Sequence, residues 1–393
     1  MKKSIFFAAI AAIALIAGCA KSVDLAPATG TQHAIGFSNY APHALTKAGD
    51  TYAASTTLID GKVFDVYAYA TANGTAFATT AIGTQFMSGV EVTYGDGGDS
   101  DATKNTYSPL RYWPSGDTPD WLTFWAYYPV QTDNGIAYTA PTGSNGVGSY
   151  AFTAASAAAD MVDFMVSDVV NDKIYGTAAG EHIAVNGVVP LTFRHQLTKI
   201  AVKILTDNTD ECTNVVLTDV KLYNIKTTGT LSATYDASAT TPTSTSWESQ
   251  AIASSPVVYE VTKAGADFNN EVLTTTAVGG EDADIFLMVP QETVASTGTT
   301  PQYILITWDV KTYDTAAHAT AKGTEGLLST TSNSQKVYLD DVDVKDGSDN
   351  TVSNDWAKNQ FTTYTITVGP KPIRFTAEVE GWDDETFGAI SVM

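Results

Sequence analysis

The sequence predicts an all-β protein made of two tandem β-sandwich domains. Hydrophobic and polar residues alternate in many short runs, for example from Lys62 to Tyr69 and from Lys199 to Leu205. This alternation places every second side chain on one face of a strand. Clusters of Gly, Asp, Asn and Thr separate the runs, as turns do in sandwiches. The chain has 393 residues, a length typical of two domains.

Strand patterns recur along most of the chain after residue 34. The expected strands are 62–69, 85–94, 122–128, 188–193, 199–205, 215–225, 285–289, 303–310 and 364–368. Helical composition occurs at Ala154–Phe164, and the polar stretch Asp236–Ser255 is expected to be a surface loop. We place a domain boundary between His195 and Gln196, because the strand pattern restarts there.

The amino terminus predicts export. Lys2 and Lys3 precede the apolar run Ile5–Ile16, which is too short to span a bilayer. The next residues, Ala17-Gly18-Cys19, resemble the lipobox of bacterial lipoproteins. We therefore expect cleavage between Gly18 and Cys19 and a diacylglyceryl lipid on Cys19. The alternative is a plain signal peptide in which Cys19 is incidental.

Charge and cysteine content limit the classes of partner. The chain has 21 Lys and Arg against 43 Asp and Glu, a net charge of −22. This charge repels nucleic acid and anionic membranes, so we expect membrane contact only through the lipid. If Cys19 is acylated, Cys212 is the one remaining thiol and no disulfide forms.

The sequence contains no recognised catalytic or cofactor motif. It has no H-E-x-x-H run, G-x-S-x-G elbow, P-loop or dinucleotide glycine pattern. We therefore expect neither an enzyme nor a cofactor, and no metal site. Two acidic loops leave a calcium alternative open, and spatially paired carboxylates of a glycosidase leave another. The loops contain Asp96, Asp99 and Asp101, and Asp340, Asp341 and Asp343.

Aromatic residues are concentrated between residues 113 and 128. They have two interpretations: core residues, or an exposed platform on which sugars stack. The residues are Trp113, Trp121, Trp125, Tyr127 and Tyr128. The second interpretation gives the alternative function, a monomeric surface glycan-binding lipoprotein.

Several segments, in this order behind the lipobox, resemble the fimbrillin family, the Mfa-like and FimA-like pilins of type V pili. The segments are Tyr112–Pro114, Trp121–Pro129, Asp163–Ser167, Val189–Ile200 and Ala377–Trp382. The resemblance implies two transthyretin-like (Greek-key) β-sandwiches and export as a lipoprotein to the outer membrane and cell surface. It also implies that a trypsin-like protease removes an amino-terminal segment with the first strand. A strand from another pilin subunit then fills the resulting groove.

The sequence supplies candidates for each of these parts. Ala34–Tyr40 would be the removable first strand, and Lys47–Ala48 the cleavage site. The family's better-known requirement is Arg, but the first Arg here is Arg111, and an ordinary exposed Lys47 is the alternative. Ile373–Val379 and Gly388–Met393 are candidate donor strands, and stalk, tip and anchor positions in the fibre stay open.

The expected organisation has four parts. They are a signal peptide (1–18), a tether with the removable strand (19–47), an N-terminal sandwich (48–195) and a C-terminal sandwich (196–393). The expected function is that of a non-enzymatic structural subunit of a surface pilus that contributes to adhesion.

Overall fold

The computed structural model describes most of the chain after residue 31. The described residues are 32–40, 61–77, 82–95, 105–130, 135–142, 146–236, 243–253, 257–263, 265–266, 268, 270–280, 284–346, 348–370 and 374–381.

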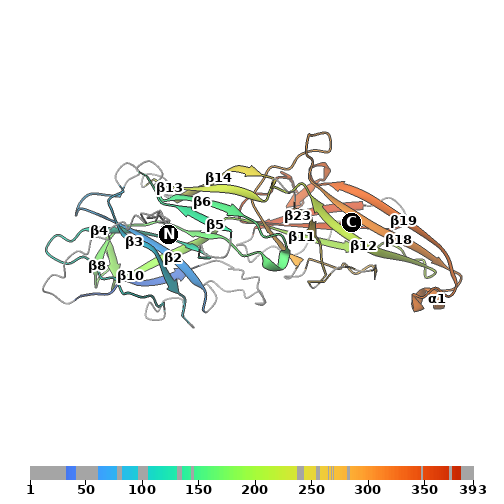
Figure 1. Cartoon of the computed structure of the whole chain (residues 1–393), viewed down its shortest axis with the longest axis horizontal. Helices are drawn as coiled ribbons and strands as arrows, with labels where there is room; N and C mark the ends of the chain where they lie inside the picture. Colours follow the sequence, from blue (N-terminus) through green and yellow to red (C-terminus); the bar gives the residue numbers. More distant parts are fainter. Residues whose placement is uncertain are drawn as a thin grey trace, which may run out of the picture.

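The described chain is an elongated all-β protein, as the sequence predicts (Figure 1). Two sheets lie in its left half in that view. The larger sheet contains β1 (Gly36–Tyr40), β10 (Val188–His195), β7 (Met165–Ser167), β4 (Trp121–Tyr128), β2 (Val63–Thr71) and β3 (Thr84–Thr93) in this order, with β8 (Val170–Gly176) paired to β4 and β9 (Ile183–Val185) paired to β8. The smaller one contains β14 (Thr243–Ala251), β13 (Thr228–Tyr235), β6 (Gly148–Thr153) and β5 (Ile136–Thr139).

Two further sheets form the other half of the molecule. One has the order β17 (Phe286–Met288), β11 (Thr198–Leu205), β22 (Gln360–Thr367), β23 (Arg374–Gly381), β20 (Val344–Asp346) and β21 (Thr351–Val352). The other has the order β15 (Tyr259–Glu260), β12 (Thr213–Tyr223), β18 (Tyr303–Tyr313) and β19 (Leu327–Tyr338), with β16 (Glu271–Val272) beside β12.

Helix is scarce in the described residues. The expected helical stretch Ala154–Phe164 forms only the 3-10 turn η1 (Ala158–Asp160). Other described turns of helix include α1 (Ala316–Ala321) and η3 (Leu339–Asp341). The expectation of a loop over Asp236–Ser255 is wrong, because β14 lies within it. Its Ser and Thr side chains mostly face solvent, so no apolar alternation marks the strand.

Both faces of the largest sheet are buried, which explains its nearly continuous hydrophobic strands. Along β2, Phe64 and Val66 belong to a core on one face, while Tyr67 and Tyr69 belong to a second core on the other. The second core continues through the four-stranded sheet. The Tyr67 ring lies 4.2 Å from that of Tyr138 on β5, between ring centroids. Burial raises the pKa of Tyr67 to about 12, so this phenol is neutral at physiological pH.

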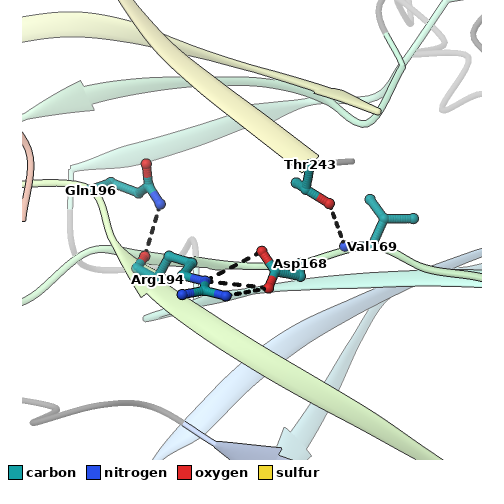
Figure 2. A network of polar contacts seen from close by, with 5 residues as sticks. All are labelled: Asp168, Val169, Arg194, Gln196 and Thr243. Atoms are coloured by element: carbon teal, nitrogen blue, oxygen red, sulfur yellow. Dashed lines mark hydrogen bonds and ion pairs between the residues drawn. The ribbon is translucent and has the colours of Figure 1, made fainter. Parts of the chain in front are cut away.

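A polar network around Gln196 joins β10 to β14. The Gln196 side chain donates a hydrogen bond to the carbonyl oxygen of Arg194 (2.8 Å) and accepts one from Thr245 Oγ1 (2.8 Å). The Gln196 carbonyl accepts a bond from Trp247 Nε1 at 2.7 Å. Figure 2 shows a second link nearby, in which the Val169 amide donates to Thr243 Oγ1. These contacts hold β14 against the largest sheet.

The position of the domain boundary between His195 and Gln196 stays a proposal. β13 and β14 follow that point in the chain, whereas β6, the partner of β13, precedes it. The four-stranded sheet therefore contains residues from both sides of the expected boundary.

Candidate functional site: the groove that holds the first strand

The first strand occupies a defined groove. β1 runs parallel to β10, with Gly36 opposite Val188 and Tyr40 opposite Thr192. This confirms a strand within Ala34–Tyr40. Because β1 is the first element and pairs with one strand only, its removal would leave the rest of the sheet ladder intact.

A segment of irregular structure, residues 105–113, holds the other edge of the first strand. The Ile35 amide donates to the Arg111 carbonyl (2.9 Å), and the Trp113 amide donates to the His33 carbonyl (2.9 Å). Two side chains of this segment donate to strand carbonyls. Tyr107 Oη bonds to the oxygen of Ile35 at 2.9 Å, and Asn105 Nδ2 bonds to that of Phe37 at 2.6 Å. The first strand is thus hydrogen-bonded along both edges.

Alternate side chains of the first strand point into the core. Ile35 and Phe37 are 1% and 0% exposed. The Phe37 ring makes edge contacts with the rings of Tyr107 and Phe124, at centroid distances of 5.6 and 6.1 Å. Alternating apolar side chains that fill pockets, together with main-chain bonds at the edges, are the features of β-strand addition.

Gly187, just before β10, allows the closest approach in the groove. Its carbonyl accepts bonds from the Gly36 amide (2.9 Å) and from Trp113 Nε1 (3.1 Å). Its φ is +77°, a conformation that glycine adopts without strain. A Cβ atom here would lie 2.9 Å from Trp113 Nε1 and 3.1 Å from the Ala34 oxygen. The close contacts of residue 187 with Trp113 and with the first strand therefore require a glycine. We call Asn105, Tyr107 and Gly187, which hold the first strand, the clamp.

Replacing Gly187 by Ala is expected to loosen the first strand. Gly74→Ala is the matched control, because Gly74 has φ +79° and no atom lies within 4 Å of the point that a Cβ atom would occupy there. Both variants incur a backbone cost of about 1–2 kcal/mol in free energy of unfolding. Only Gly187→Ala should also speed hydrogen exchange of the β1 amides, measured by mass spectrometry. Equal exchange in the two variants would contradict this role for Gly187.

Several strongly exposed apolar side chains belong to the segments that form the groove. The described residues include six large hydrophobic side chains that are strongly exposed: Tyr40, Leu110, Tyr112, Val185, Val258 and Leu328. Tyr40 ends β1, Leu110 and Tyr112 belong to the 105–113 segment, and Val185 lies two residues before Gly187.

The predicted processing residues lie outside the described residues. This applies to Gly18 and Cys19, to Lys47 and Ala48, and to the candidate donor Gly388–Met393. The other candidate donor forms most of β23, which pairs with β22 over eight residues and with β20 on its other edge. This strand therefore belongs to a sheet of its own chain.

The aromatic residues considered for sugar stacking are mostly core residues. Trp113, Trp125, Tyr127 and Tyr128 are each at most 5% exposed. Trp121 is half-buried and stacks on the His182 ring at 4.2 Å. The glycan-binding alternative required these rings to be exposed, and most of them are buried.

The described residues also contain no metal-binding cluster of three or more His, Cys, Asp or Glu side chains. Two of the loop aspartates instead accept protein hydrogen bonds: Asp340 from Thr293 Oγ1 at 2.8 Å, and Asp341 from the Ser296 amide at 3.3 Å. Within the same described part, no helix is long and apolar enough to cross a bilayer.

Sequence reasoning singled out Tyr112 and Trp113, but it missed that the 105–113 segment and Gly187 hold the first strand. Asn105 and Tyr107 contact residues 68 and 72 positions away in the chain, and an irregular segment has no periodicity that reveals such contacts. The dipeptide Asn186-Gly187 was a detectable signal, because it is typical of turns that need positive φ.

Comparison with solved structures finds proteins of similar fold. A fimbrial protein from Bacteroides vulgatus is 20% identical in sequence, with 89% of this chain and 99% of that chain aligned and a TM-score of 0.57. The tip fimbrial protein Mfa3 from Porphyromonas gingivalis is 10% identical, with coverages of 89% and 100% and a TM-score of 0.38. No match is found among curated proteins.

The class of protein is therefore an all-β protein with the fold of a fimbrial protein. The family model described as "Fimbrillin-like" matches residues 51–382. The chain belongs to this family, and it has a fimbrial structural or adhesion role at the cell surface.

Proposed function

We propose that this chain is a pilus subunit that assembles by exchange of its first strand. In this proposal the chain is exported to the outer membrane as a lipoprotein with its lipid on Cys19. A trypsin-like protease then cuts between Lys47 and Ala48. The cut releases the lipid and the first strand together, and a strand from another subunit takes the vacated place.

The observation that carries the proposal is that the first strand is hydrogen-bonded along both edges, to β10 on one side and to residues 105–113 on the other. Ile35 and Phe37 are buried, and the strand is the terminal element of its sheet. Lys47 lies seven residues after Tyr40, and the next Lys or Arg is Lys62, immediately before β2. A cut at Lys47 therefore separates the first strand from β2 without interrupting either strand. Loss of the strand would uncover the apolar lining around Phe124, which favours capture of a replacement.

Sequence similarity supports the carboxyl-terminal tail as the replacement strand. Ala34-Ile35-Gly36-Phe37 has the order Ala, Ile, small residue, apolar residue, and Ala389-Ile390-Ser391-Val392 repeats this order. In the same register Ile390 would fill the position of Ile35, and Val392 that of Phe37. β23 is a poorer candidate because both of its edges are already paired.

The Lys47→Ala variant tests the processing step. Limited digestion of the precursor by a trypsin-like protease is expected to create a new amino terminus at Ala48, followed by polymers. Lys47→Ala should abolish both, because the only other Lys or Arg between β1 and β2 is Lys62, which directly precedes β2. Mass spectrometry identifies the terminus, and electron microscopy detects the fibres.

Lys62→Ala is the matched control for this experiment. It removes the neighbouring lysine without touching the proposed site, so it should be cut at Lys47 and polymerise like the parent chain. A Lys47→Ala protein that still formed polymers would overturn cleavage at this residue. If the parent chain were cut at Lys47 but formed no polymer, the proposal of assembly by strand exchange would be contradicted.

A further inference from the structure

The edge formed by β19 differs from every other sheet edge in the described residues. β19 spans twelve residues, Leu327–Tyr338, and pairs with β18 along one side only. A strand edge exposes unpaired amide and carbonyl groups and is a template for another strand. Figure 1 shows β18 and β19 as long neighbouring strands in the right half of the molecule.

The other described edges are shortened, irregular or covered. The edge strands β5, β9, β15, β16, β17 and β21 have four residues or fewer. β3 has two register irregularities with β2, and the 105–113 segment covers β1. On β14, Lys358 Nζ donates to the carbonyl of Thr245 at 2.8 Å. Natural proteins protect sheet edges by such devices.

β19 lacks these devices over most of its length. Residues 327–335 read Leu-Leu-Ser-Thr-Thr-Ser-Asn-Ser-Gln, without Pro, Gly or any charge. From Ser329 to Ser332 every side chain is exposed, and Leu328 is 67% exposed. The pairing with β18 is regular from Tyr338 to Ser329. Within β19, Asn333 Nδ2 donates a hydrogen bond of 3.0 Å to the carbonyl oxygen of Thr331. An amide of an incoming strand could replace this side-chain donor.

The charge distribution permits a second copy of the same chain to be the partner at this edge. The protein carries a net charge of −22, so two copies repel each other over most of their surfaces. The β18–β19 ribbon is an exception, because its only charged residues are Asp309, Lys311 and Lys336. Asp309 already accepts a hydrogen bond from Ser332 at 2.7 Å. Two copies can therefore approach through this ribbon without local acidic repulsion.

We infer that β19 pairs with β19 of a second copy, antiparallel and about a two-fold axis. A two-fold axis brings the same edge of each copy together, and the Ser and Thr side chains are then their own cross-strand partners. The pairing joins the two five-stranded sheets into one continuous sheet. It does not involve β1 or its groove, so it links molecules side by side independently of strand exchange.

Sedimentation equilibrium tests the inference on the chain from Cys19 to Met393, made without the lipid and with Lys47 uncut. The first strand then stays in its groove, and strand exchange cannot produce association. A concentration-dependent monomer–dimer equilibrium is expected. Thr331→Lys should weaken dimerisation by about tenfold or more, because a lysine on an edge strand opposes pairing with another strand and each copy then carries the added charge.

Two further variants separate the edge from a general effect of charge or misfolding. Ser329→Lys, on the same strand, should weaken dimerisation in the same way. Ser246→Lys adds the same charge to an exposed position of β14 and should leave the dimer unchanged. Hydrogen exchange should show protection of β19 amides as concentration rises. A chain that stays monomeric, equal effects of Thr331→Lys and Ser246→Lys, or protection confined to another strand would overturn the inference.

Discussion

Replacing Phe37 by Ala is expected to lower the free energy of unfolding of the uncleaved chain by about 3–4 kcal/mol. Phe37 is fully buried and makes ring contacts with Tyr107 and Phe124, so truncation leaves a cavity between the first strand and the sheet. Urea denaturation followed by tryptophan fluorescence measures the loss.

Tyr40→Ala is the control on the same strand. Tyr40 is 47% exposed at the end of β1, and its truncation should change stability by less than about 0.5 kcal/mol. Similar losses for the two variants would mean that the pocket of Phe37 does not anchor the strand. That result would also remove the main reason for a subunit to capture a replacement.

The second large effect is expected at a buried pair beneath the same sheet. His195 Nδ1 lies 2.8 Å from Asp163 Oδ2, and both side chains are fully buried. Asp163→Ala should lower the free energy of unfolding by about 3 kcal/mol, because it removes the carboxylate from a buried imidazole. The same denaturation experiment measures this change.

The neighbouring ion pair provides the matched comparison. Arg194 Nη2 lies 2.9 Å from Asp168 Oδ2, but these side chains are 55% and 33% exposed (Figure 2). Asp168→Ala should therefore cost no more than about 1 kcal/mol. If both aspartates had equal effects, burial would not be what distinguishes the two pairs.

The strands that could be predicted from sequence are those with an apolar face. Alternation in β2, β11 and β18 reports side chains that pack into a core, and the structure confirms these strands. Most of β19 is exposed on both faces, and on β14 Trp247 is the one large apolar side chain that packs against the core, so neither strand has an apolar alternation in its sequence. Their Ser and Thr residues fit strands, but they also fit loops.

For the candidate site, sequence reasoning found the strand but not what holds it. The alternation from Ala34 to Tyr40 predicts a strand, and the structure confirms a strand there, with Ile35 and Phe37 buried. The clamp at Asn105, Tyr107 and Gly187 results from tertiary contacts, which one sequence does not encode as a local pattern. The two segments Asp163–Ser167 and Val189–Ile200 are separate in the sequence, yet their strands β7 and β10 pair directly.

The four-stranded sheet has a consequence for the order in which the molecule can be completed. β5 and β6 are made early, but their sheet lacks β13 and β14 until the ribosome has passed residue 251. Until then Tyr150 on β6 and its aromatic neighbours are only partly buried. A nascent chain that ends at His195 is thus an incomplete sandwich with an open hydrophobic side. Synthesis must therefore reach β14, in the second half of the chain, before the four-stranded sheet of the first half can be completed.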